Sequence, residues 1–208
     1  MSLSTPIRYA ALGAADTVGV GSNSPASENW TARLRAALPR DTVYERFARS
    51  GLSLDEARSS ELPRVIEFQP TLVTMWLSVN DVLRPVPLPA YQQSLQATLT
   101  RLTRETTARV ALLNVPDLAT LAGFHATAEM RAKLREQALM WNAAIDETAR
   151  PFGPRVLVVD LLSVSRELAE HGEWLCSDAF HPSPAGYQKL ADVTLEAMRR
   201  AGWPPAVP

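Results

Sequence analysis

The sequence has almost no cysteine and no concentrated charge. Its 208 residues include a single cysteine, Cys176, so no disulfide can form within the chain and nothing marks an oxidising compartment. The 21 lysines and arginines stand against 22 aspartates and glutamates, with no run of either sign. Binding to nucleic acid or to a membrane surface through a basic patch needs a concentrated positive field, so neither nucleic acid nor a membrane is expected as a partner. The composition indicates a protein that acts on something small or neutral.

Targeting and metal-binding signals are also missing. No apolar run approaches the roughly 18 residues of a membrane helix, so no membrane span is expected. The first residues lack the basic-then-apolar order of a secretory signal. This predicts a cytoplasmic location, although a removed leader would leave no trace in the chain. The three histidines, His125, His171 and His181, have no ligand-like spacing, so no metal site is predicted. The sequence does not determine the oligomeric state.

What the sequence does have is a regular alternation of short apolar runs and longer helical patterns. The near-continuous apolar character of the short runs favours strands covered on both faces, as in a parallel sheet. Strand–helix alternation repeated five times is typical of an α/β domain with right-handed crossovers. One α/β domain is therefore expected over residues 1–208. The predicted strands are Arg8–Gly13, Thr42–Ala48, Thr71–Leu77, Arg109–Val115 and Arg155–Leu161.

The helix candidates between these strands have recognisable ends. Ser53 and Glu56 have the spacing of a capping box, in which each satisfies an orphan amide of the other. The last helix has Ser183 as N-cap, Pro184 at its first position and Gly202 as a stop signal. The remaining candidates are helices over Asn29–Leu38, Tyr91–Thr107 and Ala126–Arg150, and a stiff proline-rich loop over Arg84–Pro89.

In such a sheet the ligand site lies beyond the carboxyl ends of the strands. The loop after the first strand, Ala11–Gly21, contains several glycines. A glycine-containing turn at this position commonly binds a phosphate or carries a nucleophilic residue. The phosphate alternative fails, because the loop has no Gly-Lys-Ser/Thr and its glycines do not form Gly-x-Gly-x-x-Gly. Arg49 also stands where an acidic residue would hold a ribose.

Three further segments carry polar groups, two of them after predicted strands and one just before the last helix, and each has a purely structural alternative. In Arg49–Gly51 the glycine lets the backbone offer its N–H to a ligand, or it is a plain turn glycine. In Ser78–Asp81 the Asn80 amide can donate to developing negative charge, or the segment is an Asx-turn. The spacing of Asp178 and His181 lets the carboxylate fix the imidazole tautomer and leaves a general base, or the pair is a surface Asp and a loop His.

Taken together and in this order, the four segments resemble the SGNH (GDSL-type) hydrolase family. The family's blocks are Gly-Asp-Ser in the first loop, a Gly after the second strand, Gly-x-Asn-Asp after the third and Asp-x-x-His near the C-terminus. The resemblance spans Tyr9 to Tyr187. It implies a three-layer α/β/α fold with a flavodoxin-like, five-stranded parallel sheet, and hydrolysis of esters through an acyl-enzyme without metal or organic cofactor.

The resemblance also implies roles for residues of this chain. Asp178 would orient His181, and His181 would be the general base. The oxyanion would be held by the Gly51 N–H, the Asn80 side chain and the N–H at position 15, which aligns with the nucleophilic serine. The expected partner is a small-molecule ester.

Two departures from the family pattern stand out. Ser78 replaces a glycine, which narrows the acyl site or adds a hydrogen bond. Ala15 replaces the nucleophile, and a methyl group has no lone pair to attack a carbonyl, so the chain as written is expected to be inactive. Ala14 also replaces the family's aspartate, and Asp16, which follows two residues later, is expected to do some of the structural work of that aspartate.

Three accounts of Ala15 are open. The native residue could be serine, with Ala15 an engineered knock-out; the chain could be a natural non-catalytic relative that binds an ester or sugar; or Thr17 or Asp16 could act as a displaced nucleophile. The first is preferred, because His181, Asp178, Asn80 and Gly51 have little reason to coexist without a nucleophile.

The expected walls of the substrate site are apolar, which indicates small or lipophilic carboxylic esters more than sugars. They are Val79, Val82, Leu83, the loop over residues 116–124, Trp174 and Phe180.

Overall fold

The computed structural model describes residues 6–84, 86–121 and 126–203, and its core is one parallel sheet. The five strands lie in the order β2-β1-β3-β4-β5, and every neighbouring pair is parallel. This is the doubly wound order of flavodoxin-like proteins, so the predicted fold class is confirmed. The strands are β1 (Arg8–Gly13), β2 (Val43–Ala48), β3 (Leu72–Trp76), β4 (Arg109–Leu113) and β5 (Val156–Val159).

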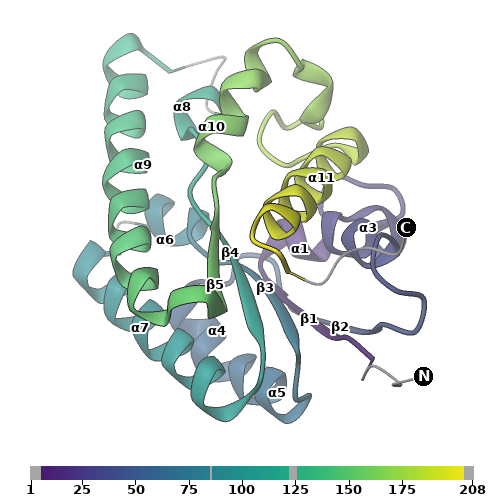
Figure 1. Ribbon diagram of the computed structural model, residues 1–208. Helices are drawn as coiled ribbons and strands as arrows, with labels where there is room; N and C mark the ends of the chain where they lie inside the picture. The colour runs from purple at the N-terminus through teal and green to yellow at the C-terminus, as the bar shows by residue number, and fades with distance from the viewer. Residues whose placement is uncertain (1–5, 85, 122–125, 204–208) are drawn as a thin grey trace.

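Helices cover both faces of the sheet (Figure 1). Helices α3 (Trp30–Ala36) and α11 (Pro184–Arg200) cover one face. Helices α4 (Leu54–Ser60), α5 (Leu62–Glu67), α7 (Leu88–Glu105) and α9 (Ala128–Ala149) cover the other. Shorter elements lie mostly at the ends of the strands: α1 (Ala15–Val18), α2 (Pro25–Glu28), α6 (Val79–Leu83), α8 (Leu118–Leu121), α10 (Leu161–Ser165), and the 3-10 helices η1 (Arg150–Arg155), η2 (Arg166–Ala169) and η3 (Gly172–Trp174).

Successive side chains of a strand enter different cores, because their direction alternates across the sheet. In β1, Ala10 and Leu12 join the core under α4, α5, α7 and α9. Tyr9 and Ala11 join the core under α3 and α11, where the Tyr9 hydroxyl lies 2.9 Å from Thr74 Oγ1. Burial on both faces explains why the strands read as continuous apolar runs in the sequence.

The capping signals of the sequence are seen in the structure. Ser53 and Glu56 form the complete capping box at the start of α4, and Ser183 caps α11 with Pro184 at its first position. The proline-rich segment, predicted as a loop over Arg84–Pro89, is helical in its last two residues, Leu88 and Pro89. Helix α7 begins at Leu88, three residues before the expected Tyr91, because a proline fits the first turn of a helix, where its missing N–H leaves no bond unmade.

Candidate active site

The first loop makes a tight turn from β1 into α1. The strand ends at Gly13, and α1 begins at Ala15. A Cβ on Gly13 would lie 2.0 Å from Thr17 Oγ1, so the turn needs a glycine at this position. The first N–H groups of a helix have no partner within the helix, which leaves the amide at position 15 available as a donor. The sequence therefore folds into the turn that presents residue 15 at the end of the sheet.

His181 and Asp178 form a hydrogen-bonded pair in the segment before α11. The Nδ1 atom of His181 lies 2.6 Å from Oδ2 of Asp178. An ionised carboxylate can only accept, so Nδ1 carries the proton and Nε2 is the acceptor of the neutral ring. The His181 side chain retains 21% exposure, which leaves its other edge accessible. The pair has the geometry of an oriented general base.

Asp178 is held in its ionised form by several donors. Burial opposes its charge, but hydrogen bonds from the His181 ring, the Cys176 thiol and two backbone N–H groups outweigh this, so the pKa of Asp178 lies well below its usual range. The two N–H groups belong to Phe180 and His181, at 2.9 and 2.8 Å from Oδ1. Cys176 Sγ lies 3.0 Å from the same oxygen. Cys176, which has no role in the sequence analysis, thus helps to position the carboxylate.

Most of the candidate site residues line one cleft, here called the His181 cleft. It holds about 330 Å³, part of it open to solvent, and opens at the carboxyl ends of β1 and β3. Ala15, Asn80 and His181 lie on its wall together with Ser78, Val79 and Phe180. Asp178 and Gly51 do not line it: Asp178 lies behind His181, and Gly51 belongs to the adjacent loop after β2. The full lining is Ala14, Ala15, Asp16, Trp76, Leu77, Ser78, Val79, Asn80, Phe180 and His181.

The loops after β2 and β3 are tied to each other. Asn80 Nδ2 donates to the carbonyl of Leu52 at 3.0 Å, which links the cleft wall to the loop that contains Gly51. Gly51 has a φ of +75°, in the region that glycine adopts most readily. Ser78 is buried, and its Oγ has no hydrogen-bond partner among the described residues. These contacts place the Asn80 amide and the Gly51 turn on the same side of the cleft.

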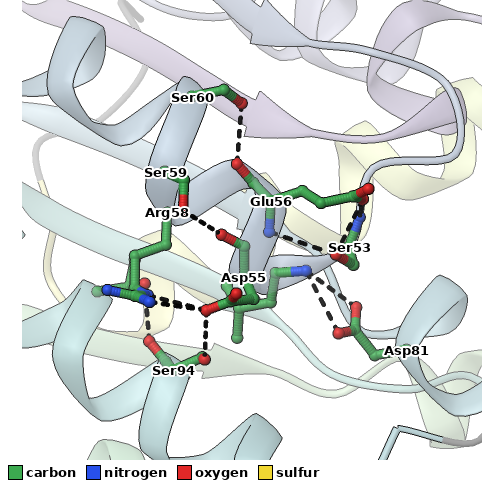
Figure 2. Close-up of polar contacts among 10 residues, drawn as sticks. Ser53, Asp55, Glu56, Arg58, Ser59, Ser60, Asp81 and Ser94 are labelled. Carbon is green, nitrogen blue, oxygen red and sulfur yellow. Dashed lines mark hydrogen bonds and ion pairs between the residues drawn. The ribbon is translucent and has the colours of Figure 1, made fainter.

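Asp81, the last residue of the block after β3, serves the fold. Its Oδ2 accepts from the Leu54 N–H at 3.0 Å, at the first turn of α4 (Figure 2). Burial raises the pKa of Asp81 to about 6, against the opposing effect of this hydrogen bond. Asp81 therefore joins the block after β3 to α4, the helix after β2, whereas the neighbouring Asn80 lines the cleft.

Asp16 is the residue of the cleft that sequence reasoning placed least well. It was expected to replace some of the structural work of the family's aspartate at position 14, yet it lines the cleft beside Ala15. Burial raises the pKa of Asp16 to about 6, and the nearby His181 opposes this effect. Its position directly after residue 15 is the sequence signal that could have found it.

Thr17, the other residue considered as a displaced nucleophile, is fully buried. Its Oγ1 lies against Gly13 and has no hydrogen-bond partner among the described residues. A hydroxyl packed under the turn cannot reach a substrate in the cleft.

A second, larger cleft adjoins the first and is here called the apolar cleft. It holds about 610 Å³, part of it open to solvent, and shares Asp16, Trp76, Val79 and Phe180 with the His181 cleft. Of the predicted substrate walls, Val79, Pro116, Leu121, Trp174 and Phe180 line it. Val82 and Leu83 do not: Val82 packs in the core and Leu83 faces solvent. Residues 122–124 of the predicted 116–124 wall lie outside the described residues.

Within the described ranges, no group of three or more His, Cys, Asp and Glu side chains is arranged to hold a metal ion. Nor is any helix in this part of the chain both long and apolar enough to cross a membrane.

The profile of the GDSL-like Lipase/Acylhydrolase family matches residues 12–189. The chain therefore belongs to this family of SGNH-type hydrolases, as the four motifs indicated. Among curated proteins, none matches this chain.

Solved structures share the fold at low sequence identity. The psychrotrophic esterase EstA from Pseudoalteromonas sp. has 16% identity and a TM-score of 0.72, with 93% of this chain and 97% of that chain covered. A lipase from a goat rumen metagenome has 22% identity and a TM-score of 0.73, covering 95% and 98%. A catalytic mutant of an acetylxylan esterase from Geobacillus stearothermophilus has 19% identity and a TM-score of 0.73, covering 100% of both chains.

Proposed function

We propose that this protein is a serine carboxylic ester hydrolase of SGNH type, present here in a form in which Ala15 replaces the catalytic serine, so that the chain as written binds its ester without turning it over. The observation that carries the proposal is the position of His181. Its ring, oriented by Asp178, shares one cleft with Ala15 and Asn80. Membership of the GDSL-like family supports ester hydrolysis as the chemistry.

The complete reaction would use each group in turn. A hydroxyl at position 15 gives its proton to His181 Nε2 and attacks the ester carbonyl. The oxyanion accepts hydrogen bonds from the Asn80 amide and the N–H groups of residues 15 and 51. His181 returns the proton to the leaving alcohol, and water then hydrolyses the acyl-enzyme by the same route. Asp178 stays ionised throughout and stabilises the imidazolium.

The natural substrate would be a small or lipophilic carboxylic ester. The apolar cleft next to the His181 cleft supports this, because it is lined mainly by Leu, Val, Trp, Phe and Pro side chains. Burial of an alkyl group against apolar side chains lowers the free energy of binding, whereas these side chains provide no hydrogen bonds for the hydroxyl groups of a sugar.

The decisive experiment restores the hydroxyl. Ala15→Ser should hydrolyse nitrophenyl butyrate and nitrophenyl octanoate at least about 10⁴-fold faster than the parent, because loss of a serine nucleophile costs up to about a millionfold in turnover. Ala15→Gly is the matched control, since it changes the same side chain without adding an oxygen. The gain should disappear in the double variant Ala15→Ser/His181→Ala.

A second candidate function is a ligand-binding protein without catalysis, which is favoured by the methyl group at position 15 itself. Ala15→Ser that folds but stays inert on every ester would support this alternative. If the parent already turns over esters at enzyme-like rates, a group other than residue 15 is the nucleophile. Asp16→Asn in the parent chain then tests the one polar neighbour that lines the cleft.

A further inference from the structure

Asp16 lies where the two clefts meet. It is one of four residues that line both the His181 cleft and the apolar cleft, and it is the acidic member of that shared wall. The other three, Trp76, Val79 and Phe180, are apolar. A ligand that extends from beside Ala15 into the apolar cleft must therefore pass this carboxylate.

The carboxylate is not committed to the fold. Within residues 6–84, 86–121 and 126–203, its one hydrogen bond comes from its own backbone N–H. Asp81, with the same pKa direction and the same dominant cause, accepts instead from the Leu54 N–H. An acid that binds no other element and faces a cleft costs stability, so its presence points to a ligand.

The titratable groups around Asp16 come from two segments. His181 and Asp178 act on it from the segment before α11, and Tyr187 lies close enough in α11 for its phenol to be affected by the carboxylate. Lys189, also in α11, lines the apolar cleft, but its ammonium is engaged by Glu167 at 2.8 Å. Among the described residues that line both clefts, Asp16 is the ionisable one, so its carboxylate is the charge that a head group meets on passing between them.

We propose that Asp16 is a specificity-determining residue that excludes anions: it admits a neutral carbonyl group with an alkyl chain and rejects the carboxylate that ester hydrolysis produces. This rests on the proposed function for the identity of substrate and product. Hydrolysis converts a neutral ester and water into an alcohol and an acid, which ionises at neutral pH. Repulsion between two carboxylates in a poorly solvated cleft then favours release of the product over its retention.

The Ala15 chain is suited to the test, because equilibrium binding can be measured without turnover. Isothermal titration compares octanamide, a neutral carbonyl compound, with octanoate and octane-1-sulfonate, whose charge is independent of pH near neutrality. At about pH 8, octanamide should bind at least about tenfold more tightly than either anion. Asp16→Asn should remove most of that difference by strengthening binding of the anions. Asp55→Asn, which changes the net charge equally on the exposed side of α4, should leave it unchanged.

Lowering the pH gives a second readout. Because the pKa of Asp16 is about 6, octane-1-sulfonate should bind the parent more tightly at about pH 5 than at about pH 8. The change in affinity that persists in Asp16→Asn measures the contribution of all other groups. The difference between the two variants belongs to Asp16.

The location is tested by filling the apolar cleft. Val164→Trp, checked for native circular dichroism, should abolish octanamide binding, because Val164 lines this cleft and not the His181 cleft. Equal affinities for octanamide and octanoate, with no effect of Asp16→Asn, would overturn the inference, and so would the absence of binding by all three compounds. Either result leaves the proposed function to be decided by Ala15→Ser.

Discussion

Asp16 and Asp81 follow neighbouring strands of the sheet, and burial raises the pKa of each to about 6, yet their surroundings differ. Asp81 accepts the Leu54 N–H and ties α4 to the loop after β3. Asp16 faces the two clefts and receives no hydrogen bond from another described residue. The same side chain thus serves the fold on one side of the site and meets ligands on the other.

The contrast extends to the segments around these two residues. Near Asp81, Ser53 and Glu56 satisfy each other in a capping box (Figure 2). Near Asp16, Asp178 collects four donors, but it does so to orient His181. A hydrogen-bonded carboxylate therefore has a purely structural role only when the residue that it binds does not itself line the cleft.

The largest expected effect concerns the Asp178 side. In the Ala15→Ser background, Asp178→Asn should lower kcat by about 10³–10⁴-fold, because the Asn amide favours the wrong imidazole tautomer. Steady-state kinetics with nitrophenyl esters measures this. A loss of less than about tenfold would contradict the orienting role of Asp178.

Both perturbed acids make the stability of the fold depend on pH. Since the pKa of Asp81 is raised from 3.8 to about 6 in the folded state, the folded chain binds more protons between these values. Its free energy of unfolding should therefore fall as the pH rises through this window, and Asp16 contributes with the same sign.

Asp81→Asn removes its part of that slope while keeping an acceptor for the Leu54 N–H. The free energy of unfolding of the variant, relative to that of the parent, should rise by up to about 3 kcal/mol between about pH 4 and pH 8. Urea unfolding at the two pH values measures this difference. A stability difference independent of pH would show that the Asp81 carboxyl is not perturbed by burial.

A smaller effect on stability is expected at Gly186 of α11, where the chain around Trp174, which precedes the Asp178–His181 pair, packs against the helix. A Cβ on Gly186 would lie 2.0 Å from the Trp174 carbonyl oxygen, which is backbone and cannot rotate away. Gly186→Ala should destabilise the protein by about 1–3 kcal/mol, through the strain of an overpacked site. Gly172→Ala is the control, because a Cβ there meets no atom within 4 Å. Equal thermal stabilities of Gly186→Ala and Gly172→Ala would contradict the close packing of Trp174 on α11.

The smallest effect belongs to the Asp81 side. Ser53→Ala removes the cap of α4 and should cost about 1 kcal/mol without altering ligand affinity. Any change in octanamide binding would show that the capped helix also supports the cleft, and the distinction between the two sides would fail.

Much of the site could be anticipated from order along the chain. Asn80 and His181 line the same cleft as Ala15, because the carboxyl ends of parallel strands lie at one edge of the sheet. Gly51 follows β2, as expected, but it does not line this cleft; its loop is linked to the cleft through the Asn80–Leu52 hydrogen bond. Motif order gives the neighbourhood of a residue, whereas its side chain's direction depends on packing.

The substrate walls were anticipated less well. Val82 and Leu83 were expected beside the ligand, but helix α6 turns Val82 into the core and Leu83 towards solvent. Leu161, Val164 and Leu168 form part of the apolar cleft, although nothing in their local sequence distinguishes them from core residues. A cleft formed between segments far apart in the chain leaves no periodic pattern in any one of them.

The evenly balanced charge and single cysteine already limited this protein to interactions through a few convergent polar groups. The sequence alone determined the strands, the helix caps, the Asp178–His181 pair and the alanine at position 15. These features depend on neighbours a few residues away or on the alternation of apolar residues, so local chemistry specifies them. The tertiary structure alone decided that Asp16 lies on the wall shared by two clefts while Asp81 lies under a helix. That difference arises because burial and partner choice depend on which distant segments pack against each carboxylate.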